Sequence, residues 1–249
     1  MKVFAENALE LLPAYFILAE ANIGMGGSRL KKAEEFLIAA KWNLLKSKND
    51  NKEDKSRIGD ESLLDANEIT RFEAMLNRMF GKLFMANGNP KAIDELALGI
   101  YRDSEEYGPE HIELSSSYFN MGQLFYQKDE PDKAKAFYLK ICDIWKKYVL
   151  NPENTEEDEN TALLIDEAYK HLHEVNAFLE RNSDENSTST ADCTFALALV
   201  SYRCGKRDEA LDLMERSYMI YQTKLGEYAK KTKDVEDAIK FIQENQGNQ

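Results

Sequence analysis

The sequence predicts an all-α fold, an α-α superhelix of stacked helix hairpins with about nine to eleven helices. Two observations lead to this fold class. The chain of 249 residues has only 12 Gly and 5 Pro, and it is rich in Ala, Leu, Glu and Lys, which are good helix formers. Small and apolar residues also recur in one fixed pattern along the chain. A helix pair of this kind cannot bury its apolar face alone, so neighbouring pairs must exist.

The clearest copy of the pattern runs from Tyr118 to Ile141. It fits slots 4, 7, 8, 11, 20, 24 and 27 of a tetratricopeptide repeat, which is a pair of antiparallel helices. The small residues at slots 8 and 20 lie where the two helices cross, because a larger side chain there would hold the helix axes apart. The seven slots hold Tyr118, Met121, Gly122, Phe125, Ala134, Tyr138 and Ile141.

Three further copies share these slots. Chance apolar spacing in an ordinary helical bundle is the alternative explanation, and four aligned copies argue against it. The copies are Tyr15, Leu18, Ala19, Ala33, Leu37 and Ala40, with two extra residues in the turn; Asn77, Phe80, Gly81, Phe84, Ile93, Ala97 and Ile100; and Thr194, Leu197, Ala198, Ser201, Ala210, Met214 and Ser217.

These copies predict a single array over residues 1–249. Its first three hairpins cover about 13–47, 63–107 and 109–150, with Pro13 and Pro131 each in the first turn of a helix, where proline is tolerated. Residues 46–60 are charged and nearly devoid of apolar side chains, which predicts a mobile loop insert.

The second half of the chain is less regular. Residues 151–160 form an acidic connector, a helix follows over 161–181, and residues 182–190 form a Ser/Thr/Asn-rich loop before the fourth hairpin. The interval from Gly122 to Ala198 leaves room for a further repeat, but only one helix is visible in it. We therefore expect a repeat that has lost its second helix. A last helix over about 228–245 would cap the array.

Several classes of function are excluded or disfavoured by composition. The net charge of −13 argues against nucleic-acid binding, and no apolar run is long enough to cross a membrane. Three cysteines make a disulfide framework improbable and favour a reducing, intracellular compartment. The C-terminal helix carries several lysines, which could contact an acidic partner, although a solvated helix face is the simpler interpretation.

The sequence offers no chemistry of an active site. His171 and His173 are two apart on a helix and point in different directions, so they cannot share a metal. The glycine-rich stretch at 24–27 ends a helix and does not follow a strand, so it predicts a lengthened hairpin turn and not a phosphate loop. We assign no catalytic residue, no cofactor and no metal ligand, and expect no enzymatic activity.

Slots 5, 9 and 12 of each repeat point into the concave groove of such an array, where partners bind. The aromatic residues among them are suited to anchor an interface. The alternative is that the superhelix closes tightly, or that the C-terminal helix fills the groove, and both interpretations stay open. The predicted protein-binding set is Phe16, Arg78, Lys82, Met85, Phe119, Gln123, Tyr126, Phe195, Leu199 and Tyr202, with Glu20 and Ile23 in the remaining slots.

Certain strings are more specific than the repeat. Residues 12–21, 33–37 and 40–47, together with Tyr118 to Tyr126 and then Ile144-Trp145, resemble the repeat region of the MYND-domain-containing zinc-finger protein 12 family. The resemblance covers about residues 3–148 well. It departs from the family in two respects. The cysteine-rich segment of a MYND finger does not occur in this chain, and the second helix of a repeat after Arg181 is missing from the pattern. The chain is thus either a fragment or a relative without the finger, and zinc is not carried over.

The resemblance implies a role in motile cilia. The family is similar to axonemal components that work with another tetratricopeptide protein to attach inner-arm dyneins to doublet microtubules. It therefore implies those proteins as partners and the axoneme, within the cytoplasmic cytoskeleton, as the location. One alternative is a general cytoplasmic adaptor that binds a short peptide in its groove. Another is an enzyme or regulatory subunit that uses the array to dock a substrate.

Overall fold

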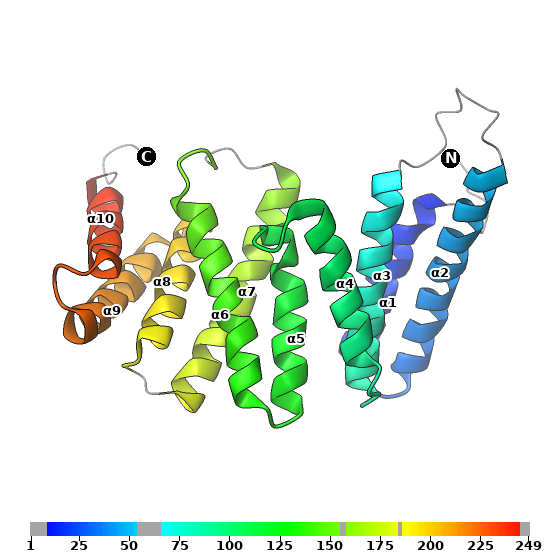
Figure 1. The fold of residues 1–249 in the computed structure, drawn as a ribbon, viewed down its shortest axis with the longest axis horizontal. Coiled ribbons are helices and arrows are strands. Elements are labelled where there is room, and N and C mark those ends of the chain that lie inside the picture. Colours follow the sequence, from blue (N-terminus) through cyan, green and yellow to red (C-terminus); the bar gives the residue numbers. More distant parts are fainter. Residues whose placement is uncertain (1–8, 54–65, 155–157, 184–185, 245–249) are drawn as a thin grey trace. The chain divides into compact units, whose positions relative to one another are not determined.

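The computed structural model describes residues 9–53, 66–154, 158–183 and 186–244. Over these ranges the chain forms ten α-helices and two short 3-10 helices, with no strand (Figure 1). The all-α class and the helix number predicted from the sequence are therefore confirmed. The helices belong to two compact units, Met1–Pro109 and Glu110–Gln249. None of the described helices is long and apolar enough to cross a membrane.

The N-terminal unit consists of two helix hairpins. Its elements are the 3-10 helix Leu9–Leu11, α1 (Leu12–Met25), α2 (Arg29–Glu53), α3 (Ala66–Ala86) and α4 (Ala92–Tyr107). Pro13 lies in the first turn of α1 as predicted. The turn between α1 and α2 contains Gly26 and Gly27, both with positive φ, which glycine adopts without steric cost. The glycine-rich stretch is therefore the hairpin turn that the sequence predicted.

Helix α2 is longer than the sequence predicted. Residues 46–53, expected to begin a loop, continue the helix to Glu53, while residues 54–60 lie outside the described part of the chain. Adding a residue to an existing helix costs little, because nucleation has already occurred. Lys48 in this extension also forms an ion pair with Glu73 of α3. The charge pattern alone predicted a loop because it does not reveal this pairing.

The register of α4 differs by one residue from the prediction. Ala92, Leu96 and Gly99 are the buried residues of this helix, not Ile93, Ala97 and Ile100. Ala92 follows Gly81 by 11 residues, whereas Ala134 follows Gly122 by 12. The interval between the two small residues is thus one residue shorter in the α3–α4 hairpin, which shifts the packing face of α4 by one residue. A Cβ at Gly81 would lie 2.5 Å from the side chain of Leu96, which shows that the two helices cross closely here.

The C-terminal unit contains two hairpins and two single helices. Its elements are the 3-10 helix Ile112–Leu114, α5 (Ser115–Gln127), α6 (Pro131–Leu150), α7 (Glu159–Asn182), α8 (Thr188–Arg203), α9 (Arg207–Leu225) and α10 (Lys230–Glu244). The slot residues Ala134, Tyr138 and Ile141 are buried in the α5–α6 hairpin, and Ala198, Ala210 and Met214 are fully buried in the α8–α9 hairpin. The repeat pattern thus predicted both hairpins in register.

Helix α7 is the single helix expected between the two hairpins. It packs against α5, α6 and α8. Asp158 caps its N-terminus by accepting a hydrogen bond from the Thr161 amide at 2.7 Å, so α7 already includes the last two residues of the predicted connector 151–160, of which 155–157 lie outside the described residues. Ser187 caps α8 in the same way, at 3.1 Å from the Thr190 amide. The predicted loop 182–190 is therefore shorter, because such caps begin a helix directly.

Candidate protein-binding site

The N-terminal unit buries one of the residues predicted to line a groove. Phe16 is 1% exposed, and its ring stacks on Phe72 of α3 at a centroid distance of 6.3 Å. The next hairpin covers this slot, so Phe16 belongs to the core of the unit. Arg78 and Met85 are partly buried. Lys82 forms an ion pair with Glu20 at 2.7 Å, which links the two groove slots to each other.

Helix α7 covers the predicted groove residues of α5. Phe119 is buried and stacks on His171 of α7 at 3.8 Å between ring centroids. Tyr126 is half-exposed, with its edge against Phe178 at 5.1 Å. Gln123 donates a hydrogen bond to Glu174 at 3.4 Å. Phe119 is therefore a core residue and not part of an open groove. The sequence did not predict this, because α7 has no repeat partner from which its position could be inferred.

Helix α10 covers the predicted groove residues of α8. Phe195 and Leu199 are buried in one cluster with Val235 and Ile242 of α10. Tyr202 stays partly exposed and contacts the ring of Phe241 edge-on at 6.4 Å. The interpretation in which the C-terminal helix fills the groove therefore holds for this part of the chain, and Phe195 and Leu199 are not available to a partner as exposed side chains.

Two adjoining pockets remain open beside α10. The polar pocket has a volume of about 430 Å³ and lies between α6 and the start of α10. The apolar pocket has a volume of about 740 Å³ and lies between the end of α6, α8 and the end of α10. Both are lined by Leu150, Asn151 and Asp234, so they adjoin each other, and we call the two pockets together the α6–α10 groove. It is our candidate site in the C-terminal unit.

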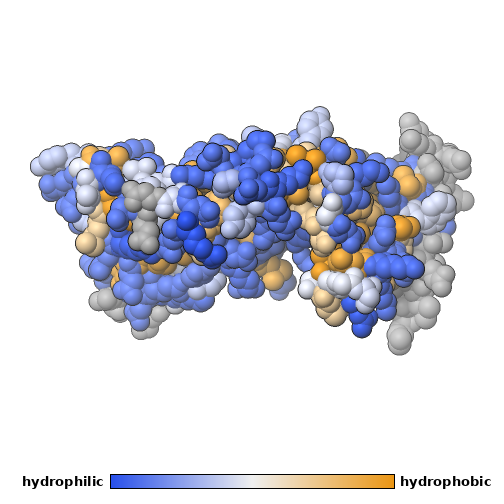
Figure 2. Space-filling view, turned by 90° about the horizontal axis from the view of Figure 1, so that it is seen from below, coloured by the Kyte–Doolittle hydropathy of each residue, from blue (hydrophilic) through white to orange (hydrophobic). Residues whose placement is uncertain are grey.

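The apolar pocket combines buried and exposed apolar side chains. Leu199, Met214 and Ile242 are buried and form its inner wall. Leu150 is 46% exposed and Phe241 is 58% exposed at its edges. On the face of the molecule drawn in Figure 2, the surface is mainly blue and hydrophilic, with separate orange, apolar areas. Exposed apolar side chains gathered around a depression are typical of binding sites.

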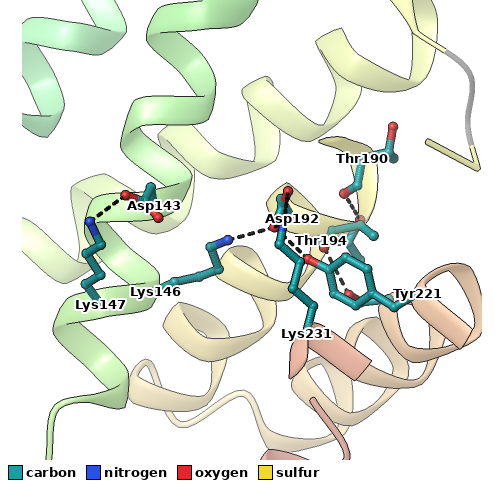
Figure 3. Close-up of polar contacts among 10 residues, drawn as sticks. Asp143, Lys146, Lys147, Thr190, Asp192, Thr194, Tyr221 and Lys231 are labelled. Carbon is teal, nitrogen blue, oxygen red and sulfur yellow. Dashed lines mark hydrogen bonds and ion pairs between the residues drawn. The ribbon is translucent and has the colours of Figure 1, made fainter. Parts of the chain in front are cut away.

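Asp192 of α8 organises the polar pocket (Figure 3). Its carboxylate accepts hydrogen bonds from Lys146 of α6 at 2.7 Å, from the Tyr221 hydroxyl of α9 at 2.7 Å, and from Lys231 of α10 at 2.8 and 2.9 Å. One carboxylate thus connects four helices. Two lysines that line the pocket are held in place by it.

The charge state of this cluster follows from its surroundings. Burial opposes ionisation of Asp192, but hydrogen bonds from Lys146 and Lys231 outweigh it and hold the pKa of the carboxyl below its usual value. Burial, together with the negative charge of Asp192, raises the pKa of Tyr221 above the ordinary value. Tyr221 is therefore a neutral donor and Asp192 a charged acceptor at neutral pH.

Lys147 and Lys230 lie at the edge of the polar pocket. Lys147 pairs with Asp143 and with Glu110, both at 2.9 Å. Hydrogen bonds from Lys147 and Lys140 lower the pKa of Glu110 to about 2. Lys230 is exposed and forms no ion pair with any described residue. The lining of the pocket holds four lysines and two aspartates. Asp192 and Glu110 pair with three of these lysines, so Lys230 is the lining lysine that has no ion pair with a described residue.

The sequence identified only part of this site. Three residues predicted to bind a partner, Phe195, Leu199 and Tyr202, line the α6–α10 groove. Leu150 and Phe241 also line it, but they were not predicted because they do not occupy slots 5, 9 or 12 of a repeat. The lysines of the C-terminal helix were the one available signal for the polar pocket.

The histidines and cysteines lie in different environments. His171 stacks on Phe119, whereas Nε2 of His173 lies 3.0 Å from Glu209. Cys142 and Cys193 are buried thiols and Cys204 is partly exposed. In the part of the chain that the structure describes, no group of three or more His, Cys, Asp or Glu residues could hold a metal ion.

No family model matches the sequence. Among solved structures, the chain is similar to the nearly identical TPR-like repeats of a putative kinesin light chain from Podosopora anserina, with 15% identity, a TM-score of 0.42, and coverage of 90% of this chain and 99% of that one. A glutamine-to-methionine variant of the same repeats shows 16% identity, a TM-score of 0.40, and coverage of 89% and 98%.

The helix hairpins themselves define the class of protein. The chain is an all-α repeat protein whose hairpins cross at small residues, as at Gly81 and Gly122. Stacked hairpins of this class present extended surfaces to protein partners.

Proposed function

We propose that this protein is a non-catalytic scaffold for protein partners, and that the α6–α10 groove binds a segment of one of them. The observation that carries this proposal is the pair of adjoining open pockets beside α10. Leu150, Tyr202 and Phe241 offer apolar surface there that a partner can cover. Full burial of one such side chain contributes about 1.5–3 kcal/mol, before the cost of association.

The test of the groove is capture of partners from a lysate of ciliated cells. The immobilised protein is compared with Leu150→Ser, which places a polar group where both pockets meet. Leu225→Ser is the matched control, because Leu225 is similarly exposed at 44% and lines neither pocket. Mass spectrometry should show partners that are lost with Leu150→Ser and retained with Leu225→Ser. If both variants retain every partner, the groove is not the interface.

The finer proposal is that the scaffold belongs to the axoneme of motile cilia and holds a partner linked to inner-arm dyneins on doublet microtubules. It is supported by the resemblance of residues 12–47 and 118–145 to an axonemal family. Part of the resembling surface is not needed for packing, since Ile38, Trp42 and Leu45 lie on one face of α2 and are 55%, 64% and 47% exposed. Another axonemal tetratricopeptide protein is the expected partner.

Extraction of cilia tests this location. After detergent removes the membrane, an axonemal component stays with the doublets, whereas a general adaptor enters the soluble fraction. Recovery of the whole protein in the soluble fraction would overturn the axonemal proposal and leave the adaptor, which binds a short peptide in its groove, as the function. The binding proposal for the α6–α10 groove stands or falls separately with the Leu150→Ser experiment.

A further inference from the structure

The two halves of the α6–α10 groove differ in charge. The lining of the polar pocket has four lysines and two aspartates, and Asp192 and Glu110 pair with three of these lysines, which leaves Lys230 without an ion pair to a described residue. The lining of the apolar pocket has Arg203 against Asp234 and Asp237. A negative group is therefore favoured at one end of the groove and disfavoured at the other. This difference in charge, together with the apolar side chain of Leu150 that both pockets share, defines the chemistry of a ligand that fits the groove.

The lysines of the polar pocket are not equally available. Lys146 is only 17% exposed and its ammonium is held by Asp192. Lys231 also contacts Asp192, but its side chain is 48% exposed and keeps donor capacity. Lys230 is exposed and has no ion pair with any described residue. Lys147 is 55% exposed and shares its charge with Asp143 and Glu110. An incoming anion would meet Lys230 and Lys231 first.

We propose that the α6–α10 groove binds a protein segment in which an acidic residue lies beside a large apolar residue, an inference that rests on the proposed binding function of this groove. The carboxylate of the segment meets Lys230 and Lys231 at the polar pocket. The apolar side chain enters the apolar pocket and packs on Leu150, Tyr202 and Phe241. Charge complementarity then fixes the direction in which the segment lies.

A carboxylate fits the polar pocket better than a phosphate. Asp143 and Asp234 lie in the same lining as the lysines, and Asp192 already neutralises much of the charge of Lys146 and Lys231. A phosphate group carries nearly twice the negative charge of a carboxylate, so the two aspartates repel it more strongly. The remaining positive charge, mainly that of Lys230, is matched to a single negative charge.

The experiment selects random dodecapeptides displayed on phage with the full-length protein as bait. We expect enriched peptides to pair Asp or Glu with Phe, Leu, Ile or Met. A fluorescein-labelled peptide of the enriched sequence is then titrated by fluorescence polarisation. Replacing its acidic residue by the corresponding amide should weaken binding about fivefold, the order expected of one exposed charge pair.

Variants of the protein identify the two ends of the groove. Lys230→Glu should weaken binding of the labelled peptide about fivefold or more, because it replaces attraction by repulsion. Lys233→Glu is the matched control, since Lys233 is exposed on the same helix and lines neither pocket. Leu150→Ser should weaken binding about tenfold, and Leu225→Ser should leave it unchanged. Circular dichroism confirms that each variant retains its helix content.

The outcomes distinguish an error in the proposed ligand from an error in the proposed binding site. If the peptide loses affinity with Leu150→Ser but not with Lys230→Glu, or if a phosphoserine in place of the acid binds more tightly, the groove binds a segment and the acidic preference is wrong. If no peptide is enriched, or if binding is unaffected by Leu150→Ser, both the preference and the proposed binding site are wrong. Loss with Leu150→Ser and Lys230→Glu, with both controls unchanged, supports the inference.

Discussion

Gly122 of α5 lies directly against the ring of Tyr138 of α6, and a Cβ built at Gly122 would overlap that ring. Tyr138 cannot easily move aside, because Phe119 and Phe178 flank it at centroid distances of 5.9 and 4.9 Å. The close crossing of this hairpin thus depends on the absence of a side chain at one position.

Gly122→Ala should therefore destabilise the protein although alanine favours helices. We expect a loss of about 1–3 kcal/mol in the free energy of unfolding, the usual cost of overpacking a core. Gly24→Ala in α1 is the control, because no atom lies within 4 Å of a Cβ there, and alanine should stabilise this helix by up to about 1 kcal/mol. Urea denaturation followed by circular dichroism measures both. Equal effects of the two substitutions would contradict the close crossing.

Phe119 and Tyr126 should behave differently although both occupy predicted groove slots. Phe119 is 4% exposed and stacks on His171, so Phe119→Ala should cost about 3–5 kcal/mol of stability, as expected for a buried phenylalanine. Tyr126 is 47% exposed, and Tyr126→Ala should cost much less. Thermal unfolding compares the two variants. A melting temperature of Phe119→Ala close to that of the unmodified protein would show that α7 does not cover this ring.

Asp192 should make stability depend on pH. Its pKa is lowered in the folded state, so its contribution is present above the unfolded value of about 3.9 and is lost as the pH falls through the folded pKa. Asp192→Asn should cost about 1–3 kcal/mol at pH 7, because Lys146 and Lys231 lose a charged acceptor.

The difference in unfolding free energy between Asp192→Asn and the unmodified protein should shrink below about pH 4. Asp166→Asn is the control, since its pair with Lys170 is exposed on the surface of α7 and such pairs contribute about 0–1 kcal/mol. Urea titrations at pH 7 and at pH 3 measure the change. A cost for Asp192→Asn that is the same at both pH values would show that the carboxylate is not held in its charged form.

The three thiols should react at different rates. Cys204 is partly exposed, whereas Cys142 and Cys193 are buried, and burial raises the pKa of the Cys193 thiol. Because the thiolate is the reactive form, Ellman's reagent should modify Cys204 first in the folded protein. Cys204→Ser should remove the fast phase and leave the other two thiols to react after denaturation. A fast phase that persists in this variant would mean that the core around α8 opens.

The repeat pattern predicted the hairpins because the spacing of small residues reflects a requirement of packing. A Cβ at Gly122 would overlap the facing helix, and Ala19 and Ala198 are fully buried in the same slot of their hairpins, so the small residues that the sequence shows mark packed positions. The register of α4 was not visible in the same way. The interval from Gly81 to Ala92 is one residue shorter than that from Gly122 to Ala134, and apolar residues at both Ala92 and Ile93 made the two registers look alike.

The repeat slots could not predict that other helices cover the expected concave groove. Phe119 and Phe195 occupy positions that face outward in an isolated repeat, but α7 and α10 bury them. Neither covering helix has the repeat pattern, so the sequence shows the apolar face of each helix and not the surface on which it packs.

Because α7 is a single helix, an odd number of helices precedes the last hairpin within the C-terminal unit. In Figure 1, α5 begins at the top and α8 at the bottom, although each is the first helix of a hairpin. Whether the number of helices before α8 is odd or even therefore determines the direction in which α8 runs. Gain or loss of a whole hairpin before α8 keeps the direction of α8, whereas gain or loss of one helix reverses it. Reversal would exchange the ends at which Phe195 and Tyr202 lie, whereas the lysines of α6 and α10 that line the polar pocket would stay in place.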